Sequence, residues 1–249
     1  MHPSAPPVTA AALVIGNEIL SGKVEEANVA ALARALRGTG VLLRRVVVVM
    51  DEVDAIAAEV RALSSTHDWL FTSGGVGPTH DDVTVEAVAK AFGVAVVSAP
   101  SLEAMLRAHY GQECTEGHLR MALVPEGASL EVTEEITWPT IRLRNTWLLP
   151  GIPEVFRMKL PVVLARLGDT GRAFVSHAAY LQLDEGVVKP GLDRVVADFP
   201  DVSVGSYPKW HATDYRTKIT FDGRDEARTL AARDAFVASL AAGDVVRLD

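Results

Sequence analysis

The sequence predicts an α/β protein: a three-layer α/β/α domain with a mostly parallel sheet, followed by a small α+β, ferredoxin-like domain. Two observations predict this. Short apolar runs alternate with amphipathic stretches over residues 10–167, as expected for strands and helices that form a parallel sheet covered on both faces. A glycine-rich break at 168–171 then precedes a stretch with the pattern strand, helix, strand, strand, helix, strand. We therefore expect two domains, residues 8–170 and residues 171–249.

The first elements follow from periodicity and capping signals. Residues 11–15 are an apolar run of strand length, and Asn28 is placed to cap a helix over 29–37, whose apolar residues share one face. Residues 41–50 are β-branched and mostly apolar. That composition predicts a strand that is covered on both faces.

The next elements lead to the centre of the domain. Asp51 and Asp54 resemble an acidic capping box that opens a helix, and a strand follows at 69–72. Thr84 is placed to cap a helix over 85–92. Further helices are expected at 101–110, 116–122 and 154–167, and further strands at 140–143 and 146–149. In the second domain, strands are expected at 173–183, 202–207, 215–221 and 245–248, with helices at 187–199 and 224–242.

Composition narrows the class of protein. The chain has 249 residues, of which 49% are hydrophobic, enough for a full core. A net charge of −8 without a long basic run argues against nucleic acid or a membrane surface as the principal partner. Cys114 is the only cysteine, and the N-terminus has neither a basic start nor a long apolar run. These features predict a cytoplasmic protein without an intramolecular disulfide.

One stretch carries more glycine and acid than a turn requires. Residues 70–84 read LFTSGGVGPTHDDVT, with Gly74, Gly75 and Gly77 between a buried strand and a helix. Loops of this kind, at the carboxyl end of a strand, are where open α/β sheets bind ligands. Glycines let backbone amides approach a phosphate closely, beside the positive end of the helix. The spacing is neither that of a Walker A sequence nor that of GxGxxG.

Asp81 and Asp82 allow two interpretations. Two adjacent carboxylates beside a phosphate pocket can hold a divalent cation through oxygen ligands, with phosphates completing the shell. Such a cation would polarise a phosphorus–oxygen bond and activate water. Alternatively, both residues only interact with the positive end of the following helix.

The stretch SGGVGPTHDDVT resembles the signature of the molybdopterin-binding (molybdenum cofactor biosynthesis) domain family, and most closely its competence/damage-inducible protein A branch. Residues 15–22 (IGNEILSG), 123–127 (LVPEG) and 149–153 (LPGIP) are similar to other segments of that branch. Residues 204–208 and 215–218 are similar to the segment that follows this domain in eukaryotic FAD synthase. Together the resemblance spans about residues 10–248.

The resemblance implies a molybdopterin-binding-like fold and a metal-dependent pyrophosphatase that cleaves FAD or ADP-ribose into two monophosphates. It implies a divalent cation (cobalt, manganese or magnesium), with potassium as a further activator, and a homo-oligomer, either a dimer or a trimer. More distant relatives bind or adenylylate molybdopterin, so a pterin ligand is the alternative, and a non-catalytic nucleotide-binding module is a third. Because no amidohydrolase-type or adenylyl-transferring domain follows, deamidation and FAD synthesis are not expected of this chain.

The resemblance also implies roles for particular residues. The positions that would surround the ligand and its phosphates are Gly16, Gly74, Gly75, Gly77 and Thr79. Asp81 and Asp82 would be catalytic and would bind the metal, and Glu18 is expected as the additional carboxylate. Asn28 either contacts the ligand or only caps its helix.

Two aromatic side chains of the second domain offer a further candidate. Trp210 and Tyr215 could stack on a flavin or adenine ring, although hairpin packing or a subunit interface is the simpler interpretation. His80 could be a metal ligand or a proton donor, or it is only an exposed loop residue. Lys209, His211 and Arg216 add local positive charge beside the two aromatic residues.

Overall fold

The computed structural model describes residues 7–168, 173–210 and 214–249. The chain consists of two compact units, Met1–Thr170 and Gly171–Asp249, each described here by itself. Most of the linker expected at 168–171, and His211, lie outside the described residues. Within the described ranges, every helix is too short or too polar to cross a lipid bilayer.

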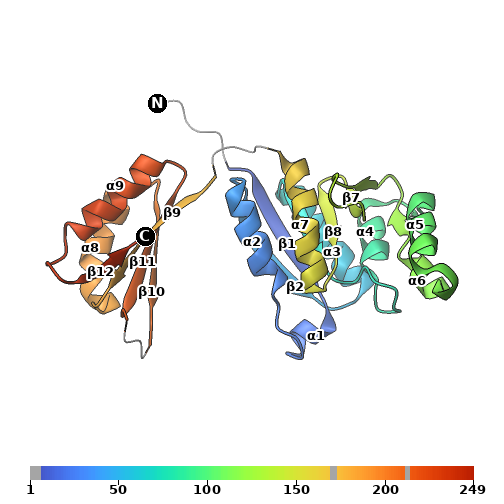
Figure 1. Cartoon of the computed structure of the whole chain (residues 1–249), viewed down its shortest axis with the longest axis horizontal. Helices are drawn as coiled ribbons and strands as arrows, with labels where there is room; N and C mark the ends of the chain where they lie inside the picture. The colour runs from blue at the N-terminus through green and yellow to red at the C-terminus, as the bar shows by residue number, and fades with distance from the viewer. Residues whose placement is uncertain (1–6, 169–172, 211–213) are drawn as a thin grey trace. The chain divides into compact units, whose positions relative to one another are not determined.

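The first unit is built on a six-stranded, mostly parallel sheet, as predicted (Figure 1). Its strand order is β2-β1-β3-β8-β7-β6. β2, β1, β3 and β8 run parallel to one another, β7 runs antiparallel to β8, and β6 runs antiparallel to β7. The bounds are β1 Thr9–Ile15, β2 Leu42–Val49, β3 Trp69–Ser73, β6 Ser129–Glu131, β7 Thr140–Leu143 and β8 Thr146–Leu149. A separate antiparallel pair consists of β4 (Val96–Ser98) and β5 (Leu123–Pro125).

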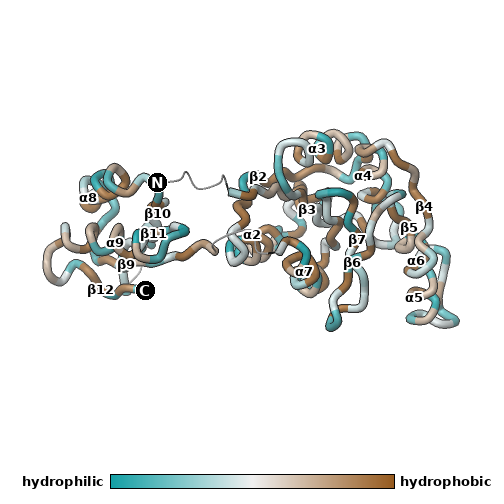
Figure 2. Tube along the Cα trace, turned by 90° about the horizontal axis from the view of Figure 1, so that it is seen from above, coloured by the Kyte–Doolittle hydropathy of each residue, from teal (hydrophilic) through white to brown (hydrophobic). Residues whose placement is uncertain are grey.

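Helices cover both faces of this sheet, so the predicted three-layer fold is confirmed (Figures 1 and 2). Two adjacent strand residues show the two cores: Phe71 packs with α2 (Asn28–Gly38) and α7 (Pro153–Leu167), whereas Leu70 packs with α3 (Val53–Thr66) and α4 (Thr84–Phe92). The short α1 (Asn17–Leu20) follows β1. Between β4 and β5 the chain forms α5 (Pro100–Tyr110), a 3₁₀ turn (Gly111–Glu113) and α6 (Glu116–Arg120).

The expectation that the strand at 41–50 is covered on both faces is wrong. β2 lies at the edge of the sheet. Val46, Val48 and Met50 are 43%, 37% and 49% exposed. An edge strand and a central strand can have the same apolar composition, and sheet order alone decides between them.

Three capping predictions are also wrong. Asn28 is the first helical residue of α2, and the carboxylate of Glu26 accepts the amides of Asn28 and the next residue at 2.8 and 3.0 Å. Thr84 is likewise the first residue of α4 rather than its cap. Neither Asp51 nor Asp54 caps α3, because the Asp51 carboxylate instead accepts the amide of Asn17 at 2.8 Å. In each case the side chain that the local sequence pattern predicted to cap a helix forms a hydrogen bond with a residue distant in sequence instead.

The second unit has the predicted ferredoxin-like order. Its elements are β9 Val175–Leu181, α8 Glu185–Asp198, β10 Ser203–Pro208, β11 Thr217–Gly223, α9 Glu226–Val237 and β12 Val245–Leu248. The antiparallel sheet has the order β10-β11-β9-β12, with both helices on one face. On the other face Arg247 lies over the ring of Tyr180 at 3.9 Å, and Tyr215 packs edge-on against Tyr180. Trp210 is 86% exposed, whereas Tyr215 packs against another ring, so the two aromatic side chains do not share one environment.

Candidate functional site

The loop between β3 and α4 has a backbone that only glycine accommodates. Gly74 and Gly75 have φ angles of +106° and +67°. A Cβ on Gly74 would lie 2.2 Å from the carbonyl oxygen of Ile15, at the end of the neighbouring strand. The buried Thr84 fixes the loop from the other side: its hydroxyl donates to the Gly74 carbonyl at 2.8 Å, and its amide donates to the Gly75 carbonyl at 2.9 Å. The two glycines are therefore held in place between β1 and the start of α4.

The two adjacent aspartates of the loop have different environments. Asp82 folds back on the loop: its Oδ2 accepts the Thr79 amide at 2.8 Å and the Thr79 hydroxyl at 2.5 Å. The side chain of Asp81 is 58% exposed. Hydrogen bonding from the Thr79 side chain is the main influence that holds the pKa of Asp81 below its ordinary value, and His80 adds to it. Asp81 is thus an exposed, charged carboxylate at neutral pH. The side chain of Asp82 instead stabilises the turn through its two hydrogen bonds to Thr79.

A cavity of about 810 Å³ brings most of the predicted site residues together. Those that line it are Glu18, Gly74, Gly75, Gly77, Thr79, Asp81 and Asp82. The cavity lies at the carboxyl ends of β1, β3 and β8, because its wall also includes Ile15 and the Pro150–Pro153 segment. This is the edge where parallel sheets bind ligands. Gly16 and Asn28 do not line the cavity.

Asn28 joins two of the loops that form the cavity wall. Its side-chain amide donates to the hydroxyl of Ser73 at 2.9 Å and to the carbonyl of Gly151 at 2.8 Å. Ser73 ends β3, and Gly151 belongs to the loop after β8. Asn28 is 4% exposed. The structure therefore gives it a positioning role, and the ligand contact implied by the family resemblance stays a prediction.

Carboxylates gather at one side of the cavity. Glu18, Asp51 and Asp81 line a shared hollow of about 520 Å³ beside α1. Among the described residues, however, no group of three or more His, Cys, Asp or Glu side chains is close enough to hold a metal ion. A cation such as Mg²⁺ is commonly bound by one or two carboxylates together with substrate phosphates and waters. The donors present fit a cation that binds together with a phosphorylated ligand.

Another part of the cavity wall is aromatic and apolar, which the sequence did not indicate. It includes Tyr110, His118, Met121 and Trp138. The rings of Tyr110 and His118 stack at 3.9 Å. His118 is fixed in turn, because its Nδ1 accepts the Thr115 amide at 3.1 Å in a capping box. This wall is suited to the flat face of a heteroaromatic ring.

Lys159 of α7 lies in the cavity wall and is 4% exposed. Its ammonium group donates to the carbonyls of Trp138 and of Pro139, the latter at 2.9 Å. Because an ammonium group has three donors, one remains for a ligand in the cavity. Burial lowers the pKa of Lys159 to about 8. Neither Lys159 nor Asp51 was predicted to belong to the site.

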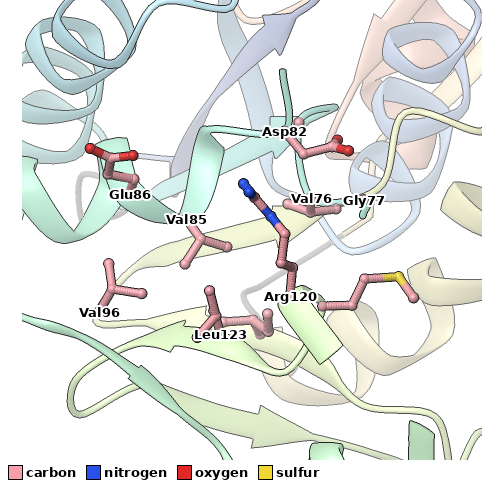
Figure 3. Close-up of a pocket in the computed structure, with 11 residues that line it drawn as sticks. Val76, Gly77, Asp82, Val85, Glu86, Val96, Arg120 and Leu123 are labelled. Atoms are coloured by element: carbon pink, nitrogen blue, oxygen red, sulfur yellow. The ribbon is translucent and has the colours of Figure 1, made fainter. Parts of the chain in front are cut away.

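A second hollow of about 350 Å³ adjoins the larger cavity along the glycine loop (Figure 3). It shares Gly75, Gly77 and Asp82 with the larger cavity. Figure 3 shows Arg120 extending from the end of α6 toward the loop, with Asp82 beyond it. The glycine loop thus lines both hollows and has the Arg120 cation near one of them.

Comparison with known proteins agrees with this architecture. Residues 11–169 match the family described as a probable molybdopterin binding domain, and residues 173–249 match the FAD synthase middle domain. The chain therefore belongs to the molybdopterin-binding domain family, and the family resemblance seen in the sequence is confirmed.

Three relatives illustrate the relation. A protein of Archaeoglobus fulgidus is 32% identical over 89% of this chain and 93% of its own length. A probable FAD synthase of Caenorhabditis elegans is 31% identical over 97% of this chain, which spans about half (51%) of that protein. The crystal structure of the protein CinA from Thermoplasma acidophilum, of unknown function, has a TM-score of 0.59 and 31% identity over 65% of this chain and 98% of its own.

Proposed function

We propose that the chain hydrolyses the pyrophosphate bond of a dinucleotide, with FAD preferred over ADP-ribose, and releases two monophosphates. The preference for FAD is supported by the second unit, which matches the FAD synthase middle domain, and by the similarity to a probable FAD synthase. The family relation supports a small-molecule ligand.

The observation that carries the proposal is the polarity of the 810 Å³ cavity. Its wall contains the glycine loop and carboxylates such as Asp81, and it also contains the rings of Tyr110 and Trp138. A dinucleotide has the same two parts, a charged diphosphate and flat rings. Cavities of this size commonly bind ligands of a few hundred daltons with a few polar groups that fix their orientation.

The chain's own residues would bind and orient the diphosphate. Backbone amides at Gly75 and Gly77, which line the cavity, would donate to phosphate oxygens, and the ammonium group of Lys159 would add positive charge. Hydrolysis breaks one phosphorus–oxygen bond of the bridge: the oxygen of water bonds to one phosphorus, and the other phosphate leaves with the bridging oxygen. Asp81, charged at neutral pH, is suited to accept a hydrogen bond from the water and orient it, and the proton that the water loses passes to solvent.

A divalent cation fits this scheme as a cofactor. Asp81 and Asp82 would hold it, with Glu18 and the bound phosphates as further ligands. When bound, the cation would supply Lewis acidity and neutralise charge on the departing phosphate. Potassium is proposed as an additional activator.

The test is a product assay on metal-free protein. FAD, ADP-ribose and NAD are incubated with magnesium, manganese or cobalt, with and without potassium, and products are separated by liquid chromatography. FMN and AMP are the expected products from FAD. Asp81→Asn should lose this activity, whereas Glu134→Gln, an exposed carboxylate outside the cavity, should keep it. Parental turnover by Asp81→Asn would exclude the role assigned to this residue.

Molybdopterin binding or adenylyl transfer is the alternative, supported by the description of the matched family. The aromatic part of the cavity wall would accept a pterin as well as a flavin. Transfer of AMP from ATP to a pterin, without hydrolysis of FAD, would select this function. Tight nucleotide binding without any product under every cation would instead select a non-catalytic module.

A further inference from the structure

Arg120 extends into the smaller hollow without a protein partner. It lines this hollow of about 350 Å³ together with the glycine loop, and Figure 3 shows its guanidinium directed toward that loop. Asp82 and Glu86 line the same hollow, yet within the described parts of the chain Arg120 forms no ion pair or hydrogen bond with any side chain. The N–H donors of its guanidinium are therefore available to a ligand.

The smaller hollow and the 810 Å³ cavity share one wall. Six residues line both of them: Gly75, Val76, Gly77, Asp82, Met121 and Ile141. This wall includes the amides of Gly75 and Gly77, which the proposed function assigns to phosphate oxygens. A phosphate held by these amides thus lies at the wall that Arg120 faces from the smaller hollow.

The charges around the two hollows favour an anion-binding role for Arg120. Five carboxylates belong to their walls: Glu18, Asp51, Asp81, Asp82 and Glu86. Among the described lysine and arginine residues, those that line the two hollows are Arg120 and Lys159. The ammonium group of Lys159 already donates to two carbonyls, at Trp138 and Pro139. A diphosphate adds further negative charge, so the site needs a second cation from the chain.

Arginine suits that requirement better than lysine does. The planar guanidinium presents several N–H groups in a fixed fork, which matches two oxygens of one phosphate. Such hydrogen bonds between charged partners are shorter and stronger than neutral ones. The position of Arg120 beside the glycine loop therefore complements the backbone amides of the loop.

We propose that Arg120 is a phosphate-binding residue of the candidate site, and that its guanidinium donates to non-bridging oxygens of the diphosphate at the glycine loop. The proposal rests on the proposed function, which supplies the diphosphate, and adds the side chain that contacts it from the smaller hollow. FAD and ADP-ribose share this diphosphate, so Arg120 raises the affinity for both and does not choose between them.

The kinetics of Arg120→Gln test this role. Loss of a hydrogen bond to a charged group should raise KM for FAD and for ADP-ribose about tenfold or more, by the same factor. Arg120→Lys keeps the charge without the fork and should recover part of the loss. Arg157→Gln is the matched control, because Arg157 is exposed on α7 and lines neither hollow; its KM should equal the parental value. An unchanged KM in Arg120→Gln, or a change confined to one substrate, would overturn the proposal.

Calorimetric titration with ADP and magnesium tests the contact without any hydrolysis of a dinucleotide. ADP carries the diphosphate, so Arg120→Gln should bind it at least tenfold more weakly than the parent chain does, while Arg157→Gln keeps the parental affinity. Urea unfolding of Arg120→Gln should stay parental, because this side chain has no partner within the described protein. If the parent chain hydrolyses no dinucleotide, the proposed function fails, and ADP binding still decides the role of Arg120. Equal ADP affinities of the parent and Arg120→Gln, or no ADP binding by the parent, would overturn that role.

Discussion

Lys159 gives the structure a measurable dependence of stability on pH. Its pKa falls from an ordinary value of 10.5 to about 8, because burial penalises the charged form. Between these values the unfolded chain retains the proton while the folded chain releases it, so the unfolded state binds more protons. The free energy of unfolding therefore rises as the pH is raised from 8 to 10.5, and this contribution is lost as the pH falls back through 8.

The size of the effect follows from the same two pKa values. One pKa unit corresponds to about 1.4 kcal/mol, which sets an upper limit of about 3.5 kcal/mol for Lys159. We expect about 1–2 kcal/mol, because the ammonium group interacts favourably with the carbonyls of Trp138 and Pro139, and deprotonation weakens these bonds.

Urea unfolding at several pH values, followed by tryptophan fluorescence, measures this effect. Trp69, Trp138 and Trp147 all belong to the first unit, so the signal mainly follows the part of the chain that contains Lys159. Lys159→Met removes the amine and keeps the apolar part of the side chain, so subtraction of its curve cancels the titration of other groups. If the two curves of unfolding free energy run parallel between pH 8 and 10.5, Lys159 has an ordinary pKa and the reasoning from burial fails.

Three further predictions concern the glycine loop. Thr84→Val should cost about 1–2 kcal/mol of unfolding free energy, because the buried Gly74 carbonyl loses its hydroxyl donor; Thr84→Ser, measured by the same urea titration, should cost much less. Gly74→Ala should lower the free energy of unfolding more than Gly93→Ala, which loses only about 1–2 kcal/mol because of its positive φ. Equal losses of unfolding free energy would contradict the close approach of the Ile15 carbonyl to Gly74. Asp81→Asn should reduce FAD turnover at least a hundredfold with unchanged urea unfolding, and retained turnover would argue against its role.

Local signals in the sequence were sufficient for the fold and for the position of the main loop. The change from a buried strand to glycines and then to helical spacing located the β3–α4 loop, and the alternation of elements predicted three layers. Leu70 and Phe71, adjacent in sequence, do pack on opposite faces as a doubly covered sheet requires.

The features that the sequence did not reveal depend on which elements become neighbours. Asp51 belongs to the site because β2 lies beside β1, an order that the chain sequence alone does not determine. Lys159 faces the cavity because α7 packs on the sheet in one particular rotation. Thr84 matched a capping signal, yet its hydroxyl donates to a loop carbonyl ten residues earlier in the chain.

The side-chain amide of Asn28 has a consequence for how this pocket can change. It spans two strand ends that are far apart in sequence, although no α2 residue lines the cavity. The relative position of these two strand ends therefore depends on a helix that does not line the cavity. Substitutions that shift or tilt this helix would alter selectivity from a distance, while ligand-facing side chains could be exchanged without loosening the frame.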